Sequence, residues 1–324
     1  MTATKDPTVL EFQVASRSPF RHGAVSPLLR VRRAALASGI RPLRNLSKFV
    51  TKLWHRRLGI PMRGTFGVVV DGQVRWVTIS TRNGHLETVL TWPVGAYEPP
   101  VRALIDNFLP QDGTFFDIGA NWGYYTTFAA SRPGFSGQIV SFEPFPPTYQ
   151  DLTNVLAQTN LGQRVRTMNM ALSDRDGEVH MVIPHSTGHA QAHMGQGGEG
   201  VQVAARRLDG LGLPAPDLVK VDVEGHELSA LTGAEKVLTE HRPVVILENW
   251  VLPDSREITL GSLRYLVTLG YRIFLPRVVH TPGGHSTLRL DEVSPEARLE
   301  HPEVVDVCAI HREQVGKYMD TTVL

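Results

Sequence analysis

The chain has 324 residues, 42% of them hydrophobic, which is enough for one large packed domain with an extension. Its lone cysteine, Cys308, excludes an internal disulfide framework and a four-cysteine zinc site, and its apolar neighbours indicate a buried thiol. No apolar run approaches the roughly 18 residues of a transmembrane helix, and the N-terminus lacks the pattern of a secretory signal, so we expect a cytoplasmic location.

The net charge of +1 is unevenly distributed along the chain. Residues 12–70 contain twelve Lys and Arg residues and no Asp or Glu. We expect residues 1 to about 24 to form a loose arm. Pro27 can open a helix, and apolar residues then keep helical spacing on both sides of Pro42, which predicts two amphipathic helices with a basic outer face up to Arg57.

Three interpretations of this basic face stay open. It can be a solvated surface packed on the main domain, or a cap that admits an anionic substrate such as a nucleotide sugar or a phosphorylated carrier. It can also bind a polyanion such as a membrane surface or nucleic acid. The segment contains no recognisable nucleic-acid-binding motif, so we expect no nucleic-acid partner.

The next elements are predicted in chain order. Residues 67–79 alternate around Asp71-Gly72 and predict a β-hairpin. A second domain is expected over residues 97–324, with residues 1–96 as its basic N-terminal extension. Its predicted strands lie near residues 114–118, 138–143, 164–170, 217–223, 243–248, 271–275 and 304–311, and its helices near residues 99–109, 122–131, 146–158, 227–239 and 258–269. This alternation implies a mostly parallel α/β sheet, and the last two strands, joined by a loop alone, predict an antiparallel pair.

A glycine turn follows the first strand of that sheet. Asp117 ends the strand, and Gly119 and Gly123 frame a turn into a helix, which presents backbone N–H groups and a positive helix end to a ligand. The second strand ends at Glu143, where doubly wound folds bind the two hydroxyls of a ribose. Together these features predict a nucleoside cofactor.

The spacing of the glycines distinguishes between cofactors. A dinucleotide fingerprint needs Gly-x-Gly-x-x-Gly, but Asn121 and Tyr124 occupy its later glycine positions. An acid beside the turn favours a cofactor that carries a positive amino group and a sulfonium instead of phosphates. The cofactor expected from this pattern is S-adenosylmethionine. An NAD-dependent oxidoreductase and a non-catalytic adenosyl-binding module remain the alternatives.

Five motifs in order carry a resemblance to a known family: "DIGANWGYYT", "FEP", "ALSD", "KVDVEGHELSALTGA" and "VILEN". Over residues 97–249 the chain resembles the FkbM family of S-adenosylmethionine-dependent O-methyltransferases. The resemblance implies a Rossmann-like class I methyltransferase sheet, mostly parallel with an antiparallel last strand. It also implies O-methylation of a sugar or polyketide-type hydroxyl in natural-product or glycan biosynthesis, on a small acceptor that can be anionic or carrier-linked.

The expected cofactor residues come partly from the motif and partly from the resemblance. Asp117 and the turn would hold the methionine part, Glu143 the ribose, and Pro144 and Phe145 the adenine side. By resemblance, Tyr97 closes over the methionine end, and residues 171–173 form the other edge of the adenine site. The complete set is Tyr97, Asp117, Gly119, Ala120, Asn121, Gly123, Glu143, Pro144, Phe145, Ala171, Leu172 and Ser173.

Acid–base residues cluster after the fourth and fifth strands. Asp222, Glu224 and His226 are the catalytic candidates, with Glu224 first because it belongs to the family motif. His226 departs from that motif and is either a specialised base or a surface residue, whereas Glu224 can instead bind substrate or hold its own turn. Asp222, Glu248 and Asn249 offer oxygen ligands for Mg²⁺ or Ca²⁺.

A glycine-rich segment, residues 185–200, places His185, His189 and His193 four residues apart. The glycines oppose the helix that a zinc site of this spacing needs. We expect a mobile loop over the active site instead.

Overall fold

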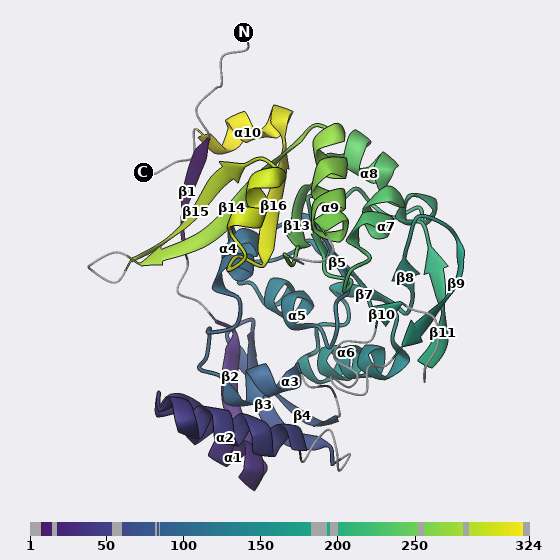
Figure 1. The fold of residues 1–324 in the computed structure, drawn as a ribbon. Helices are drawn as coiled ribbons and strands as arrows, with labels where there is room; N and C mark the ends of the chain where they lie inside the picture. Colours follow the sequence, from purple (N-terminus) through teal and green to yellow (C-terminus); the bar gives the residue numbers. More distant parts are fainter. Residues whose placement is uncertain are drawn as a thin grey trace.

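The computed structural model describes residues 8–14, 18–53, 60–81, 83, 85–182, 193–194, 200–251, 256–280 and 285–319. A nine-stranded sheet in the order β1-β15-β14-β16-β13-β12-β5-β6-β7 forms its centre (Figure 1). Its strands are β1 (Val9–Gln13), β5 (Thr114–Ile118), β6 (Gln138–Phe142), β7 (Val165–Met168), β12 (Leu218–Val221), β13 (Val244–Glu248), β14 (Tyr271–His280), β15 (Ser286–Val293) and β16 (Asp306–His311).

The strand directions confirm the predicted α/β class. Strands β5, β6, β7, β12 and β13 run parallel. Strand β16 lies between β13 and β14 and is antiparallel to both, which confirms the predicted antiparallel pair. The prediction that a loop alone joins β14 and β16 is wrong, because β15 lies between them in the chain and pairs with β14. The sheet therefore has the order and the antiparallel last strand of the Rossmann-like class I methyltransferase fold.

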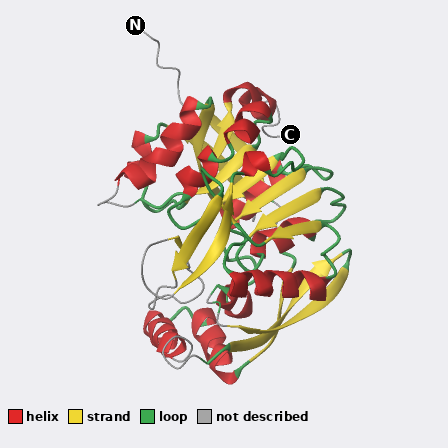
Figure 2. Ribbon diagram, turned by 90° about the vertical axis from the view of Figure 1, so that its right-hand side faces the viewer, coloured by secondary structure: helices red, strands yellow, loops and turns green. Residues whose placement is uncertain are grey.

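Helices cover both faces of this sheet (Figure 2). Phe115 packs in one core with α4 (Pro99–Phe108), α5 (Tyr124–Ala130), α6 (Pro146–Thr159) and α10 (Arg312–Met319). Its neighbour Phe116 packs in the other with α7 (Glu227–Thr232), α8 (Glu235–Glu240) and α9 (Arg256–Thr268). Successive side chains on a strand point to opposite faces, so a strand buried on both sides reads as a continuous apolar run.

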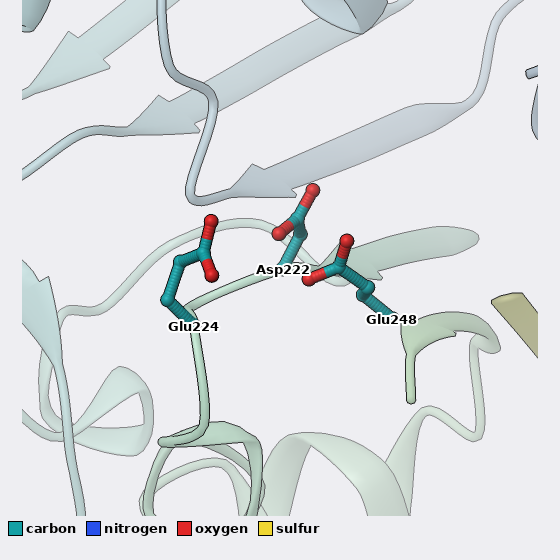
Figure 3. Close-up of side chains that lie close together, drawn as sticks. All are labelled: Asp222, Glu224 and Glu248. Atoms are coloured by element: carbon teal, nitrogen blue, oxygen red, sulfur yellow. The ribbon is translucent and has the colours of Figure 1, made fainter. Parts of the chain in front are cut away.

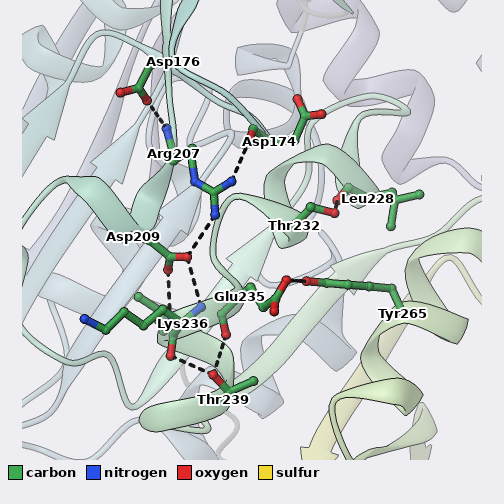
Figure 4. A network of polar contacts seen from close by, with 11 residues as sticks. Asp174, Asp176, Arg207, Asp209, Leu228, Thr232, Glu235, Lys236, Thr239 and Tyr265 are labelled. Carbon is green, nitrogen blue, oxygen red and sulfur yellow. Dashed lines mark hydrogen bonds and ion pairs between the residues drawn. The ribbon is translucent and has the colours of Figure 1, made fainter.

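The helix predicted over residues 227–239 is interrupted between α7 and α8. A Cβ atom at Gly233 would lie 1.9 Å from the carbonyl oxygen of Ser173, so only glycine permits this close approach. The Asp209 carboxylate accepts hydrogen bonds from the backbone N–H groups of Lys236 and Val237, at 3.0 and 3.1 Å, and begins a new helix there (Figure 4). Contacts with residues distant in the sequence, Ser173 and Asp209, therefore cause the interruption between α7 and α8.

A second sheet, which we did not predict, follows β7 in the chain. It has the order β10-β9-β11-β8 and consists of β8 (Ala171–Leu172), β9 (Gly177–Val182), β10 (His193–Met194) and β11 (Gly200–Arg206), followed by the 3₁₀ helix η3 (Leu208–Gly210). Apart from residues 193, 194 and 200, the predicted loop over residues 185–200 lies outside the described residues, and so do the side chains of its three histidines.

The N-terminal segment corrects one expectation. Residues 9–13 are not a loose arm, because β1 pairs antiparallel with β15 and buries Leu10 and Phe12. Residues 20–25 form β2 (Phe20–Val25), which pairs with β3 (Met62–Val70). The partners of β1 lie about 280 residues away in the sequence, and local patterning gives no sign of such a pairing.

The hairpin and the two N-terminal helices lie where they were predicted, but the helices expose apolar as well as basic side chains, and the short helix over residues 86–91 was not predicted. Strands β3 and β4 (Gln73–Thr81) form the hairpin, with Asp71 and Gly72 at positive φ in its turn. The two helices are α1 (Pro27–Ala37) and α2 (Arg41–Lys52), and a short α3 (Leu86–Thr91) precedes the second domain. The division of the chain at residue 96 stays a prediction, although Phe66 of β3 packs edge-on against Trp122 across it, with ring centroids 5.6 Å apart.

Cys308 is buried, as predicted, and burial raises the pKa of its thiol. In the part of the chain that the structure describes, no helix combines the length and the apolar character needed to cross a bilayer.

Candidate active site

The candidate site is a cavity at the carboxyl ends of β5, β6, β12 and β13. Ligands of open α/β sheets bind at this edge. Eleven of the residues expected from the sequence line it: Tyr97, Gly119, Ala120, Asn121, Glu143, Pro144, Ala171, Leu172, Asp222, Glu224 and Glu248. Asp117, Gly123, Phe145, Ser173, His226 and Asn249 are not lining residues.

The turn after β5 depends on glycine at position 119. Gly119 has a φ of +80°, and a Cβ atom there would lie 1.7 Å from the carbonyl oxygen of Asp222. The N–H groups of Gly119 and Ala120 both donate to the Phe142 carbonyl, at 3.0 and 2.9 Å. This turn therefore fixes the ends of β5, β6 and β12 against one another.

Gly123 supports the turn from outside the cavity. It begins α5 at a φ of +89°, and a Cβ atom there would approach Leu152 Cδ1 to 2.4 Å. The glycine thus allows α5 to pack on α6.

Glu143 is a buried carboxyl that faces the cavity. Its two oxygens accept hydrogen bonds from the backbone N–H groups of Asn121 and Phe145, each at 2.9 Å. Burial raises its pKa to about 7, while these two N–H groups act in the opposite direction. Each carboxylate oxygen retains a lone pair for a further donor, such as a ribose hydroxyl.

Asp117 lies behind the cavity wall. It is fully buried, and its Oδ2 accepts a hydrogen bond of 2.6 Å from Thr126 Oγ1. Its Oδ1 has no hydrogen-bond partner within the described part of the chain. Burial raises the pKa of Asp117, whereas the nearby Lys220 lowers it.

Three carboxyl groups converge on one side of the cavity. Oxygen atoms of Asp222, Glu224 and Glu248 lie within 4.8 Å of one another (Figure 3). Burial, and then the charge of Asp222, raise the pKa of Glu248 to about 11, so at neutral pH it carries a proton that bonds to Asp222. Burial and the same neighbour raise the pKa of Glu224 to about 7.

A buried lysine balances this negative charge. Lys220 Nζ lies 2.7 Å from Asp222 Oδ2, and the lysine side chain is only 2% exposed. Burial by itself lowers the pKa of Lys220, but Asp222 and Asp117 raise it further than burial lowers it, so the lysine stays charged. The ammonium group also lies 4.8 Å from the ring centroid of Tyr125.

The structure separates the two candidate bases. His226 begins α7 and does not line the cavity. Glu227, not Glu224, holds the turn, because it accepts hydrogen bonds from the N–H groups of Val223 and Gly225 at 3.4 and 3.0 Å. Glu224, at a φ of +51°, is therefore left facing the cavity.

Asn249 does not join the acidic cluster. Its Nδ2 donates to the Thr259 carbonyl at 2.7 Å, at the start of α9. The three converging acids are therefore Asp222, Glu224 and Glu248 rather than the set that includes Asn249.

Sequence reasoning missed several lining residues, notably His85, Glu98, Tyr125, Lys220 and Trp250. A signal existed for Lys220, since a charge inside the apolar strand β12 must have a buried partner. Glu98 stands at a φ of +37° directly before the Pro99-Pro100 start of α4 and accepts a hydrogen bond from the Tyr125 hydroxyl. No local pattern indicates that contact.

We predict that Lys220→Met destabilises the fold in a pH-dependent way. At about pH 8 the free energy of unfolding should fall by about 3–5 kcal/mol, because buried carboxylates lose their cation. The wild-type advantage should shrink as the pH falls toward the ordinary Asp range near 4, because the Asp222 of the variant, which is buried without its cation, takes up a proton there. In the wild type burial raises the pKa of Asp222 but Lys220 lowers it further, so Asp222 stays charged over this range. Urea unfolding of this variant and of the exposed control Lys236→Met measures both effects. An equal loss at every pH would contradict a charge-based origin.

Comparison with known proteins shows where the chain belongs. Hexuronic acid methyltransferase AglP of Haloferax volcanii is 25% identical, over 49% of this chain and 64% of that protein, so the chain spans less than two thirds of this relative. Methyltransferase sdnD of Sordaria araneosa is 27% identical, over 44% of this chain and 68% of that protein.

Among solved structures, methyltransferase FkbM from Methylobacillus flagellatus is 21% identical with a TM-score of 0.39, over 56% of this chain and 44% of that one. An O-methyltransferase from Bacillus cereus in complex with SAH is 16% identical with a TM-score of 0.37. The match covers 62% of this chain and 84% of that one. Residues 117–273 match the family model described as the Methyltransferase FkbM domain. The chain therefore carries a methyltransferase FkbM domain, which confirms the family indicated by its sequence motifs.

Proposed function

We propose that this protein is a cytoplasmic S-adenosylmethionine-dependent O-methyltransferase that acts on a hydroxyl of a sugar or polyketide-type small molecule. One observation carries the proposal. A single cavity is lined both by Glu143 beside the glycine turn and by Glu224, a carboxyl that titrates near neutral pH. The first suits a ribose, and the second suits the uptake of a proton from an acceptor.

The residues present fit the cofactor. Glu143 has lone pairs for two ribose hydroxyls, and each charged hydrogen bond contributes about 1.5–3 kcal/mol. Gly119 leaves the wall beside it free of side-chain atoms. Asp117 is buried behind this wall, so it would act on an amino group in the cavity through its charge and not through a direct hydrogen bond.

Bound S-adenosylmethionine would supply a methyl group on a sulfonium, which a neutral hydroxyl can attack. The cavity walls would hold the acceptor in line with the methyl group, and such alignment is worth an effective molarity of roughly 10⁵–10⁸ M. Glu224 takes the hydroxyl proton. Asp222, held by Lys220 and by the proton of Glu248, can accept a hydrogen bond from the acceptor hydroxyl and so orient it.

The acceptor class rests on the family and on the relatives. AglP is named a hexuronic acid methyltransferase, which supports a sugar-type acceptor. The alternatives are weaker, because an NAD-dependent oxidoreductase needs glycines where Asn121 and Tyr124 stand, and a mere adenosyl-binding module has no need of the acidic cluster.

We predict that S-adenosylhomocysteine binds with a pH dependence set by Glu143. Because ribose hydroxyls bond to the carboxylate form, affinity should rise with pH through about 7, by about tenfold between about pH 6 and about pH 8. Calorimetric titration measures this change. Glu143→Gln should bind more weakly and lose the pH dependence, while the exposed control Glu240→Gln should match the wild type.

NAD⁺ in the same titration separates the two cofactor classes. Binding of NAD⁺ but not of S-adenosylhomocysteine would refute the methyltransferase proposal. Binding of S-adenosylhomocysteine without any pH dependence would refute only the ribose role of Glu143.

We predict that Glu224→Gln lowers kcat by about 10²–10⁴-fold, the usual contribution of a general base. The Kd of S-adenosylhomocysteine should stay within about twofold, since Glu224 is assigned to the acceptor. His226→Asn serves as the contrast, because His226 does not line the cavity, and its kcat should change by less than about threefold. Transfer of a labelled methyl group to a panel of sugars measures kcat for both variants. A larger loss of kcat in His226→Asn than in Glu224→Gln would make His226 the base.

A divalent cation such as Mg²⁺ or Ca²⁺ is the alternative occupant of the acidic cluster. Lys220 already neutralises Asp222 there, and Asn249 bonds to Thr259 instead. We therefore predict that methyl transfer survives exhaustive treatment with EDTA. Loss of activity that Mg²⁺ or Ca²⁺ restores would assign a metal to Asp222, Glu224 and Glu248.

A further inference from the structure

The helix pair α1–α2 exposes an apolar surface that the rest of the described chain does not cover. Leu46 and Phe49 are 60% and 63% exposed. With four more exposed side chains they form what we call the outer apolar face: Val31, Ile40, Leu43, Leu46, Phe49 and Leu53. In Figure 1 the pair lies at the opposite end of the molecule from α10.

The residues of α2 that are buried are polar instead, while Leu43, Leu46 and Val50 line an open apolar groove along α1. The buried residues of α2 are Ser47 and Thr51, and Arg32 of α1 donates to Ser47 Oγ at 3.1 Å. Arg32 also pairs with Glu87 of α3 at 2.6 Å, which anchors the pair to the body of the protein. A helix that served only to cover a core would bury its apolar side. Here polar contacts hold α2 so that its apolar side faces outward.

The basic residues of α2 lie along a line on the helix surface that is separate from its apolar side. Arg41, Arg44 and Lys48 recur at helical spacing and are all exposed. Since 100° separates successive residues of a helix, this basic line lies opposite Leu46 and Val50. Within the described residues, none of these three bases forms a salt bridge, and residues 12–70 contain no acid.

The helix pair is also separate from the active site. The residues that line the cavity begin at His85, and none belongs to α1 or α2. A cap that guides an anionic substrate into the cavity therefore has no contact to support it among the described residues.

We propose that the outer apolar face docks on an anionic lipid membrane surface. A helix with Leu and Phe on one side and Lys and Arg on the other lies in the plane of the interface. Its apolar side then enters the acyl boundary, and its long basic side chains reach the phosphate layer. An acidic peptide bound on the apolar face would not meet bases on the opposite side of α2. A second copy docked through the same apolar face would likewise leave these bases outside the contact.

Vesicle flotation tests the proposal with the full chain. Vesicles of phosphatidylglycerol and phosphatidylcholine should bind the wild type, and vesicles of phosphatidylcholine alone should not. Leu46→Gln with Phe49→Gln should weaken binding by at least about tenfold, because two apolar side chains leave the acyl boundary. The single substitutions Arg41→Gln, Arg44→Gln and Lys48→Gln should each weaken vesicle binding by about fivefold. Ile258→Gln with Val267→Gln, two exposed apolar residues of α9, should bind like the wild type.

Thermal unfolding of each variant checks the fold, and it should be unchanged because these side chains are already exposed. No binding of the wild type to the anionic vesicles overturns the proposal. Undiminished binding of the Leu46→Gln, Phe49→Gln variant overturns the role of the apolar face. Sedimentation without vesicles provides the third check, since a wild-type dimer that this variant dissociates would make the face an interface between copies.

Discussion

The ion pair between Lys220 and Asp222 is the interaction on which the candidate site depends. Five parallel strands end at this edge of the sheet, with Asp117, Asp222 and Glu248 at or near three of those ends. Asp306 begins the antiparallel β16 directly opposite Glu248. Burial disfavours each carboxylate, and one buried ammonium group within the described residues offsets them. The remaining carboxyl groups stay protonated and therefore uncharged, since burial raises the pKa of Asp306 and of Glu248. The site thus combines a cation, an anion and a proton donor within one cavity wall.

In this arrangement, neighbouring acidic residues have different contacts and different roles. Glu227 holds the turn through backbone N–H groups, Asp222 holds the lysine, and Glu224 keeps a carboxyl whose pKa lies near 7. Residues of one type, within six positions of the chain, therefore have distinct chemistry because their partners differ. Glu143 is a further case, in which burial and two N–H donors oppose each other and leave the pKa near neutrality.

The N-terminal elements connect to the domain in two unlike ways. Strand β1 completes the edge of the central sheet next to β15, and β2 joins the hairpin sheet that supports α1 and α2. The helix pair exposes several apolar side chains close together, and polar contacts of Arg32 hold it in place. A membrane-docking surface placed away from the cavity would let the protein meet an acceptor at a bilayer without closing its own active site.

The sequence alone determined the parallel sheet, the glycine turn, the acid at Glu143 and the family, because each is encoded by residues close together in the chain. It also predicted the helices α1 and α2 and the hairpin at Asp71-Gly72. Only the tertiary structure decided that β1 is a strand of the sheet, that Gly233 divides a helix, and that Glu98 and Tyr125 share the cavity. It also decided that Asn249 turns toward Thr259 and that Asp117 stands behind the cavity wall. Contacts between residues far apart in sequence fix these features, and local periodicity carries no information about such contacts.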